Sequence, residues 1–248
     1  MPTLLLCFDA PLQSWGTMSR FVVRDTATEP TKSGVVGLLA AARGVARDDT
    51  DEIAKLAALR LGVRVDREGV VERDYHTVQN VPTTAGTGHR TVVTERYYLA
   101  DALFLVGLEG DPGLLAELYQ AVQRPRWPLF FGRKAFVPAR PLVSTGAPGE
   151  PVTGRGLVDQ PLEKALAEHP WLETRPWVRD RAEEQARQGT APRLRLVIDT
   201  EPGDLAGELR HDHPISFAHG ARRFGPRTVR VDHLDLTRKL ITGDVSCT

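Results

Sequence analysis

Cysteine is nearly absent from this chain. Of 248 residues, only Cys7 and Cys247 are cysteines, one in an apolar N-terminal stretch and one at the C-terminal end. Two thiols placed this way suggest neither a disulfide framework nor a zinc site. The histidines of His211-Asp212-His213 have no third ligand at a recognisable spacing, so we interpret this segment as a solvated turn. We therefore expect no metal and no other cofactor.

Long hydrophobic runs are missing as well. No apolar stretch approaches the roughly 20 residues that cross a bilayer. The N-terminus lacks the basic region and long apolar stretch of a secretory signal. Hydrophobic residues still make up 41% of the 27.3 kDa chain, enough to bury a sizeable core in one elaborated domain or two small ones. We expect a cytoplasmic globular protein with no membrane partner.

The chain also has no net charge, because 32 Lys and Arg residues balance 32 Asp and Glu residues. The basic residues are nevertheless concentrated in two segments. Residues 124–140 contain five basic side chains and no acid, and residues 219–240 contain six cations and two acids. The aromatic residues interleaved with the first run are Trp127, Phe130, Phe131 and Phe136. Cations meet phosphates while aromatic faces stack unpaired bases, so this composition favours RNA. A solubilising surface with core aromatics is the alternative.

The segment TKSG at residues 31–34 joins a polar turn to an apolar run that predicts a helix ending at Gly44. Ser33 is a suitable N-cap, and Gly34 lets a ligand approach the backbone. We expect the free amide groups and Lys32 to point outward together, which favours a bound phosphate. The order of residues does not match a P-loop, so a nucleotide-dependent enzyme is a weak alternative. A well-capped core helix is the other.

The pattern of apolar residues predicts an order of elements. Expected strands lie at residues 4–8, 59–65, 70–78, 91–99, 102–108, 194–198 and 228–236, with further helices at 112–122 and 161–168. We expect strands 59–65 and 70–78 to form a hairpin. The order of the first elements is that of a ferredoxin-like βαββαβ unit with an insertion. Residues 144–156 are predicted to be a surface linker, and the charged residues 179–189 to be exposed or mobile.

Three segments carry a resemblance to a known family. They are PLQSWG at residues 11–16, PTKSGVVGLL at residues 30–39 and FGRKAFVPARPL at residues 131–142. In this order and spacing, the chain resembles the Cas-five-type subunits (RAMP superfamily) of Cascade, the type I-E CRISPR surveillance complex. The likeness covers most of the chain and extends weakly into residues 222–230.

The resemblance implies an α+β fold with a ferredoxin-like, RRM-like core. Residues 1–145 would form this RAMP core, with an inserted β-hairpin thumb at about residues 76–100, and residues 146–248 a C-terminal α/β extension packed on it. It also implies a non-catalytic RNA-binding subunit that caps the 5′ handle of the CRISPR RNA in antiviral defence. The implied partners are that RNA, the Cas-seven-type backbone subunit, the large subunit of Cascade and, indirectly, target DNA.

Several residues are candidate RNA contacts. Lys32, Ser33 and Gly34 would hold backbone phosphates, and Arg133 and Lys134 would add cationic contacts. The full set is Gln13, Trp15, Lys32, Ser33, Gly34, His76, His89, Arg90, Arg96, Arg133, Lys134, Arg222 and Arg223. Trp15 is equally compatible with a role as a core anchor.

A metal-independent endoribonuclease acting on CRISPR repeat RNA is the alternative function. His76 lies beside Tyr75, and with His89 and Lys134 near in space such a set could activate a ribose 2′-OH and protonate the leaving oxygen. Some relatives in the wider family process repeat RNA this way. Their catalytic Tyr, Lys and His match no positions of this chain, and in the type I-E system a separate subunit makes the cut. We therefore assign no catalytic residue.

Overall fold

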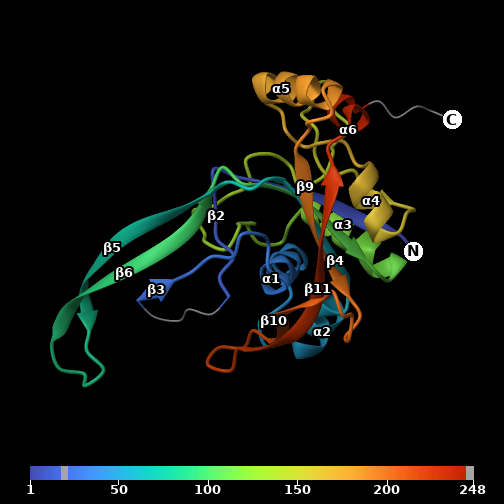
Figure 1. Ribbon diagram of the computed structural model, residues 1–248. Coiled ribbons are helices and arrows are strands. Elements are labelled where there is room, and N and C mark those ends of the chain that lie inside the picture. The colour runs from blue at the N-terminus through green and yellow to red at the C-terminus, as the bar shows by residue number, and fades with distance from the viewer. Residues whose placement is uncertain (18–21, 244–248) are drawn as a thin grey trace.

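The computed structural model describes residues 1–17 and 22–243 (Figure 1). Its larger sheet contains β1 (Thr3–Asp9), β4 (Arg60–Arg67), β7 (Leu103–Glu109), β8 (Gly156–Val158), β9 (Arg193–Thr200), β10 (Glu208–Ser216) and β11 (Arg223–Asp235). The helices are α1 (Lys32–Arg43), α2 (Thr50–Ala57), α3 (Pro112–Gln123), α4 (Leu162–Glu168), α5 (Pro176–Arg187) and α6 (Arg238–Thr242). The protein is thus of the predicted α+β class. None of these helices is long and apolar enough to cross a membrane.

The seven strands follow the order β10-β11-β9-β4-β7-β1-β8, and neighbouring strands are antiparallel. Alternate residues of β1 face opposite sides, because successive strand side chains point to opposite faces of a sheet. Leu4, Leu6 and Phe8 pack into the core that contains α1 and α3, whereas Leu5 and Cys7 pack into the core beneath α4. This two-sided burial explains the unbroken apolar run at the N-terminus. Cys247 lies outside the described residues.

The C-terminal strands extend the same sheet. β9 pairs with β4 along Gly62–Val65, and β11 and β10 follow in turn. A further apolar cluster joins α5 and α6 to the ends of β9 and β11, and Figure 1 shows these two helices above the sheet. Residues from about 193 onward therefore share the sheet of the N-terminal strands.

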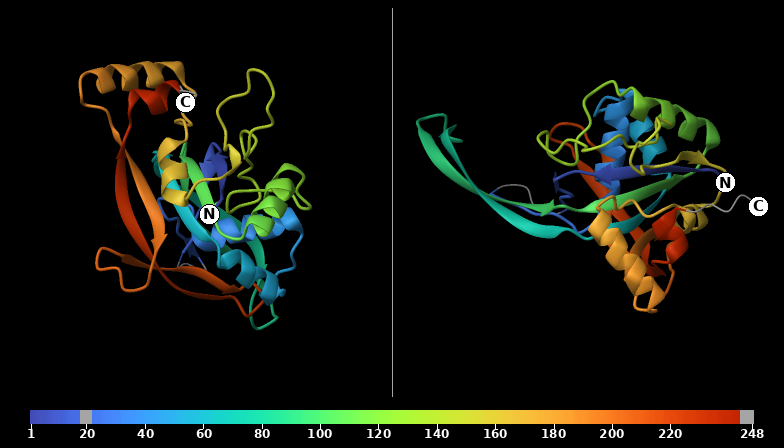
Figure 2. Two further views of the ribbon diagram at one scale, coloured as in Figure 1. Left: turned by 90° about the vertical axis from the view of Figure 1, so that its right-hand side faces the viewer. Right: turned by 90° about the horizontal axis from the view of Figure 1, so that it is seen from above.

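A long hairpin projects from this body. It consists of β5 (Val70–Pro82) and β6 (His89–Ala100), paired from Val70↔Ala100 to Pro82↔His89. At its base, β6 also pairs with the short strands β2 (Leu12–Gln13) and β3 (Val23–Arg24). Both views in Figure 2 show the main body, and the view from above shows the hairpin extending well beyond it. We call residues 70–100 the thumb; it begins before the predicted residue 76.

The predicted hairpin between residues 59–65 and 70–78 is wrong. β4 pairs with β7 on one side and β9 on the other, while β5 pairs with β6. The reason is burial: Leu61 to Asp66 are all buried, and the backbone N–H and C=O groups of a buried strand need hydrogen-bond partners on both edges. The exposed β5 cannot supply such a neighbour, so the turn at Gly69 leads away into the thumb.

One further prediction is wrong. His211-Asp212-His213 lies within strand β10 instead of a solvated turn. Residues 179–189 are mostly exposed, as predicted, although they lie largely in helix α5. Helix α2 was not predicted; its acidic start is explained by Asp49, whose side chain accepts from the Glu52 amide. Each of these elements is polar in sequence and gains its place from neighbours distant in the chain.

The start of helix α1 is closed by a buried ion cluster. The Lys32 amide donates to Oδ2 of Asp212 at 2.7 Å, and Nζ of Lys32 donates to Oδ2 of Asp199 at 2.7 Å. Arg227 binds both of these carboxylates. Lys32 is 6% exposed and Asp212 4%. The predicted outward display of amides and Lys32 is therefore wrong, because carboxylates from β9 and β10 already occupy the position of a phosphate.

The predicted N-cap is also wrong by two residues. Thr31 caps α1, with its Oγ1 accepting from the Gly34 amide at 3.2 Å, while Ser33 lies in the first turn. The predicted end is confirmed, since Gly44 takes a left-handed conformation with φ 77°.

A turn at residues 131–133, which we call the glycine turn, anchors the base of the thumb. Phe131 is buried against Phe8 and Trp15, with ring centroids 4.7 and 5.8 Å away. The Ser14 amide donates to the Phe131 carbonyl at 3.1 Å. Gly132 follows with φ 85°, and a Cβ there would lie 1.8 Å from the Ser14 carbonyl oxygen. No side chain can be accommodated without moving backbone.

Gly132→Ala should therefore destabilise the protein well beyond the ordinary strain of a left-handed residue. Gly86→Ala in the thumb tip is the matched control, because Gly86 has φ 72° with open space around its Cβ position. We expect Gly86→Ala to cost about 1 kcal/mol and Gly132→Ala at least about 3 kcal/mol in unfolding free energy, measured by urea denaturation. Equal costs would show that the Ser14 contact is unimportant.

The ion cluster predicts a pH-dependent stability. Burial alone would raise the pKa of Asp212. The hydrogen bonds and charge of Arg227 and the hydrogen bond from the Lys32 amide lower the pKa by more than burial raises it, so the pKa lies below its ordinary value. Asp212 thus stabilises the fold above the unfolded-state pKa of about 4, and this contribution is lost as the pH falls through the lower folded-state pKa. Asp212→Asn should cost about 3 kcal/mol at neutral pH.

The measurement is urea unfolding at several pH values between neutral and acid. The difference in unfolding free energy between wild type and Asp212→Asn should become smaller as the pH falls below about 4. Asp235→Asn serves as control, because its pair with Arg193 is exposed on both sides and should contribute less than about 1 kcal/mol. A difference independent of pH would contradict the electrostatic explanation.

Candidate nucleic-acid interface

Gln13 and Trp15 lie in the core, not at a surface. Gln13 is fully buried, donates to the Ala102 carbonyl at 2.9 Å and accepts from the Trp15 indole at 3.2 Å. Trp15 is 1% exposed, and a Cβ at Gly34 would lie 2.8 Å from its ring. Gly34 therefore allows α1 to pack on an indole instead of allowing a ligand to approach. The structure favours the core-anchor interpretation of Trp15 and contradicts the surface placement of Gln13 and Gly34.

Three arginines converge where the thumb joins the body. Arg96 lies on β6, and Arg24 lies opposite it because β3 pairs in parallel with β6. Arg133 comes from the glycine turn: its Nη2 donates to the Tyr97 carbonyl at 2.7 Å, and its guanidinium lies 5.4 Å from the Phe136 ring centroid. We call Arg24, Arg96 and Arg133 the thumb-base cluster. Among the described residues, none of the three forms an ion pair with a carboxylate.

The mutual repulsion of these cations appears in the pKa of Arg133. Burial lowers that pKa, and the charges of Arg96 and Arg24 lower it further, while Asp74 and Tyr98 oppose the shift more weakly. A cation disfavoured in this way is stabilised by any anion that enters the cluster. The thumb-base cluster is thus suited to a phosphate, which guanidinium groups bind with two parallel hydrogen bonds.

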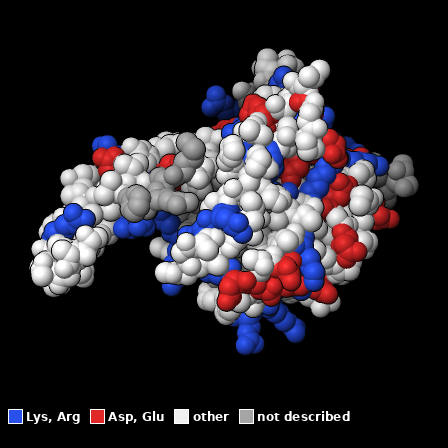
Figure 3. Space-filling view, turned by 90° about the horizontal axis from the view of Figure 1, so that it is seen from below, with Lys and Arg blue, Asp and Glu red and all other residues white. Residues whose placement is uncertain are grey.

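Sequence reasoning found two of these three residues. Arg24 was missed because residues 22–24 contain no run of cations; its pairing with β6 is what brings it to Arg96. Figure 3 shows basic side chains where the thumb meets the body and acidic side chains gathered elsewhere on the same face. The equality of opposite charges over the whole chain therefore conceals a local excess.

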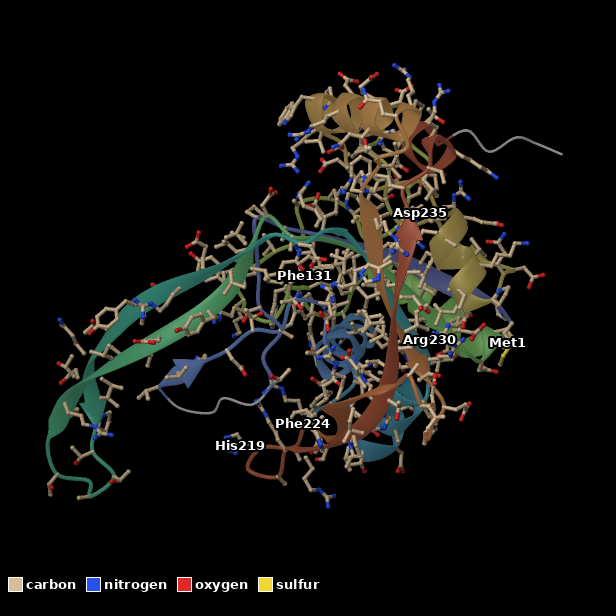
Figure 4. The ribbon with its side chains drawn as sticks, in the orientation of Figure 1. Met1, Phe131, His219, Phe224, Arg230 and Asp235 are labelled. Atoms are coloured by element: carbon tan, nitrogen blue, oxygen red, sulfur yellow. The ribbon has the colours of Figure 1, made fainter. Side chains whose placement is uncertain are left out.

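The remaining predicted contacts are exposed but spread out. His76 lies midway along β5, whereas His89 and Arg90 lie near the thumb tip beside a polar hollow of about 420 Å³. Lys134 is exposed beside Arg133. Arg222 and Arg223 lie at the end of the β10–β11 hairpin, which His219 and Phe224 mark in Figure 4, and Phe131 is labelled there in the interior. Within the described residues these two arginines form no ion pair, unlike Arg227, Arg230 and Arg238.

The structure does not assemble the proposed nuclease set. His76 lies opposite Thr94, and His89 lies five residues before Thr94 on β6. At about 3.3 Å per residue, the two histidines are roughly 17 Å apart along the thumb, too far to act on one ribose. In the part of the chain that the structure describes, no group of three or more His, Cys, Asp or Glu side chains could hold a metal ion.

Comparison with known proteins agrees with the resemblance. Residues 3–230 match the family described as CRISPR-associated protein (Cas_Cas5). The chain is 36% identical over 153 residues to the CRISPR system Cascade subunit CasD of Escherichia coli (strain K12), covering 56% of this chain and 68% of that protein.

Two solved structures are similar over nearly the whole chain. A crystal structure of a Cas protein shares 40% identity with a TM-score of 0.68, covering 94% of this chain and 95% of the other. A chain of a CRISPR RNA-guided surveillance complex shares 32% identity with a TM-score of 0.74, covering 96% and 92%. With the family match spanning most of the sequence, the chain belongs to the CRISPR-associated protein family Cas5.

Proposed function

We propose that this chain is a non-catalytic RNA-binding subunit of a type I-E CRISPR surveillance complex and caps the 5′ handle of the CRISPR RNA. Its similarity to a Cascade subunit and to a chain of an RNA-guided surveillance complex supports membership of such an assembly. The strand order β8-β1-β7-β4, with α1 and α3 in the crossovers, supports a ferredoxin-like RAMP core carrying the thumb as an insertion.

The observation that carries the proposal is the thumb-base cluster. Just over half of the arginines in the described part of this neutral chain are paired with carboxylates, including the buried Arg64 with Asp66 and Arg227 with Asp212. Arg24, Arg96 and Arg133 are brought together without such a partner. Cations concentrated without acids attract polyanions, and a phosphate backbone supplies the missing charge. Lys134 lies next to Arg133 and extends this surface.

The other contacts follow from position. His76, His89 and Arg90 line the thumb and would meet RNA that lies along it, while Arg222 and Arg223 offer a separate cationic point on the β10–β11 hairpin. Lys32, Ser33 and Gly34 are not part of the proposed interface, because the ion cluster and Trp15 occupy the helix start.

The thumb also supports a protein partner. Its strands expose apolar side chains that a lone hairpin cannot bury, with Val70, Val71 and Tyr75 each more than half exposed. Exposed apolar surface of this kind marks interaction sites. We propose that it contacts the Cas-seven-type backbone subunit, that the large subunit packs nearby, and that target DNA is met only through the assembled complex.

Removing one cation of the thumb-base cluster should change the salt dependence of RNA binding. Each phosphate contact contributes to the slope of log affinity against log salt, so Arg24→Gln and Arg96→Gln should each reduce that slope by about one. The measurement is fluorescence anisotropy with labelled CRISPR RNA over a range of salt concentrations. Arg187→Gln is the control, because Arg187 is paired with Glu183 and Glu184 on α5.

An unchanged slope in both cluster variants, with RNA still bound, would remove the thumb base from the interface. Thermal unfolding of the variants should stay close to wild type, since neither side chain forms an ion pair in the described part of the chain and Arg96→Gln removes one hydrogen bond, from Nε to Thr94 Oγ1 at 3.2 Å.

Capping of the handle predicts a preference for RNA that carries it. A CRISPR RNA with its 5′ handle should bind about tenfold more tightly than the same RNA lacking it, a difference that one good base contact can supply. Competition between the two RNAs in the presence of a chelator measures this preference, and a gel of the same samples reveals cleavage. Specific cleavage lost in His76→Ala would overturn the non-catalytic assignment.

A further inference from the structure

The basic and aromatic run at residues 124–140 divides into two parts in the structure. Its second half supplies Arg133 and Phe136 to the base of the thumb. Its first half, Arg-Pro-Arg-Trp-Pro at residues 124–128, forms a separate turn after α3, which we call the tryptophan turn. These residues are not part of the thumb-base cluster, although they combine two cations with an exposed indole.

The tryptophan turn is held rigidly against the end of α1. The Arg126 amide donates to the Ala42 carbonyl at 2.8 Å, and the Trp127 amide donates to the Ala41 carbonyl at 3.2 Å. Arg126 also covers Gly44, where a Cβ would lie 2.6 Å from its Cγ. Prolines on both sides of this segment restrict the backbone further. The indole is thus positioned before any ligand binds, which reduces the entropy lost on binding.

Charge distinguishes Trp127 from the other exposed tryptophan. Trp127 is 44% exposed, and within the described residues neither Arg124 nor Arg126 forms an ion pair. Two acids on the adjoining helices, Glu52 of α2 and Glu117 of α3, are both bound by Arg43. Trp177 is 67% exposed, but the arginine over its ring, Arg175, is already paired with Glu173 and Asp101.

The tryptophan turn is close enough to the thumb base for one strand to reach both. Arg133 follows Trp127 by six positions, so their Cα atoms are at most about 21 Å apart. Around six nucleotides at about 3.4 Å each cover that distance, within the site sizes of single-strand binders. Figure 2 shows this segment, in lime green, on the side of the body from which the thumb emerges.

We propose that the tryptophan turn is a second contact for the same RNA strand, in which Trp127 stacks on one unpaired base and Arg124 and Arg126 bind the flanking phosphates. The inference rests on the proposed RNA-binding function. An exposed indole flanked by unpaired cations is the arrangement used for single-stranded nucleic acid. A stable protein interface needs an apolar core, and the two prolines and two arginines beside Trp127 supply little apolar surface for one.

Short and long RNA should separate the two contacts. A uridine oligomer of about 12 nucleotides can span both surfaces, whereas one of about 4 nucleotides can occupy the thumb base alone. Trp127→Ala should weaken binding of the longer oligomer about tenfold, the effect of losing one base stack, and leave the shorter one within about twofold. Trp127→Phe should retain most of the affinity, because an aromatic face remains.

Tryptophan fluorescence gives an independent readout. In a Trp177→Phe background, Trp127 is the exposed tryptophan, since Trp15 and Trp171 are buried. The longer oligomer should quench its emission and the shorter one should not. Trp177→Ala is the matched control for binding and should change neither affinity. Unchanged thermal unfolding would confirm that Trp127→Ala folds.

Each remaining outcome overturns the inference. In one outcome, Trp127→Ala binds the longer oligomer with full affinity, the oligomer does not quench Trp127 in the Trp177→Phe background, and Arg96→Gln still weakens binding. This result would show that the tryptophan turn does not contact RNA, while the proposed function would stand. Normal RNA binding with loss of co-purification of the other Cascade proteins would show that the tryptophan turn is a protein interface. Failure of the wild-type chain to bind any RNA would overturn the proposed function as well.

Discussion

Four charged groups buried at the start of α1 constrain the rest of the structure. Lys32 and Arg227 are satisfied only because Asp199 and Asp212 reach them from β9 and β10. A buried charge without its partner costs several kcal/mol, so α1 and the three C-terminal strands must come together as one unit. This requirement explains why residues far apart in sequence share one sheet, and why β4 gains β9 as a second neighbour.

The same cluster determines where an anion cannot bind. A helix N-terminus attracts negative charge through its free amides, but in α1 the Asp212 carboxylate and the Thr31 hydroxyl already accept from the first of them. A phosphate is more readily accepted by cations that lack an acidic partner. Among the described residues, such arginines include those of the thumb base and of the tryptophan turn, so the pairing of arginines with acids is more informative than the net charge.

The sequence predicted elements that local signals define and missed those that tertiary contacts define. Helix α1 ends at Gly44 because a left-handed residue is needed there, and glycine provides it. Thr31 and Ser33 are equally good caps by residue type, so composition alone could not choose between them. Strand β10 contains charged and histidine residues that gave no strand signal, because its burial depends on Arg227 and the helices beneath it.

The candidate site shows the same division. Arg133 belongs to a run with a cationic excess, residues 124–140, and Arg96 to the predicted strand at residues 91–99, both of which the sequence reveals. Arg24 joins them only through the parallel pairing of β3 with β6. Trp15 stands beside a glycine in a polar connection, a context that suits an exposed aromatic, yet its indole fills the space above Gly34. Exposure of a single aromatic is a property of the packed molecule, which no local pattern encodes.

The aromatic core and the two proposed RNA-binding surfaces are connected through the glycine turn. Phe131 packs on Phe8 and Trp15, and the next residues carry Arg133 to the Tyr97 carbonyl at the base of the thumb. The same segment begins at the tryptophan turn, which is tied to the end of α1. Both cationic surfaces are thus fixed to the core through one stretch of chain, with their separation set before binding. A strand that fits this separation loses less conformational freedom from the protein than one that must order two mobile loops.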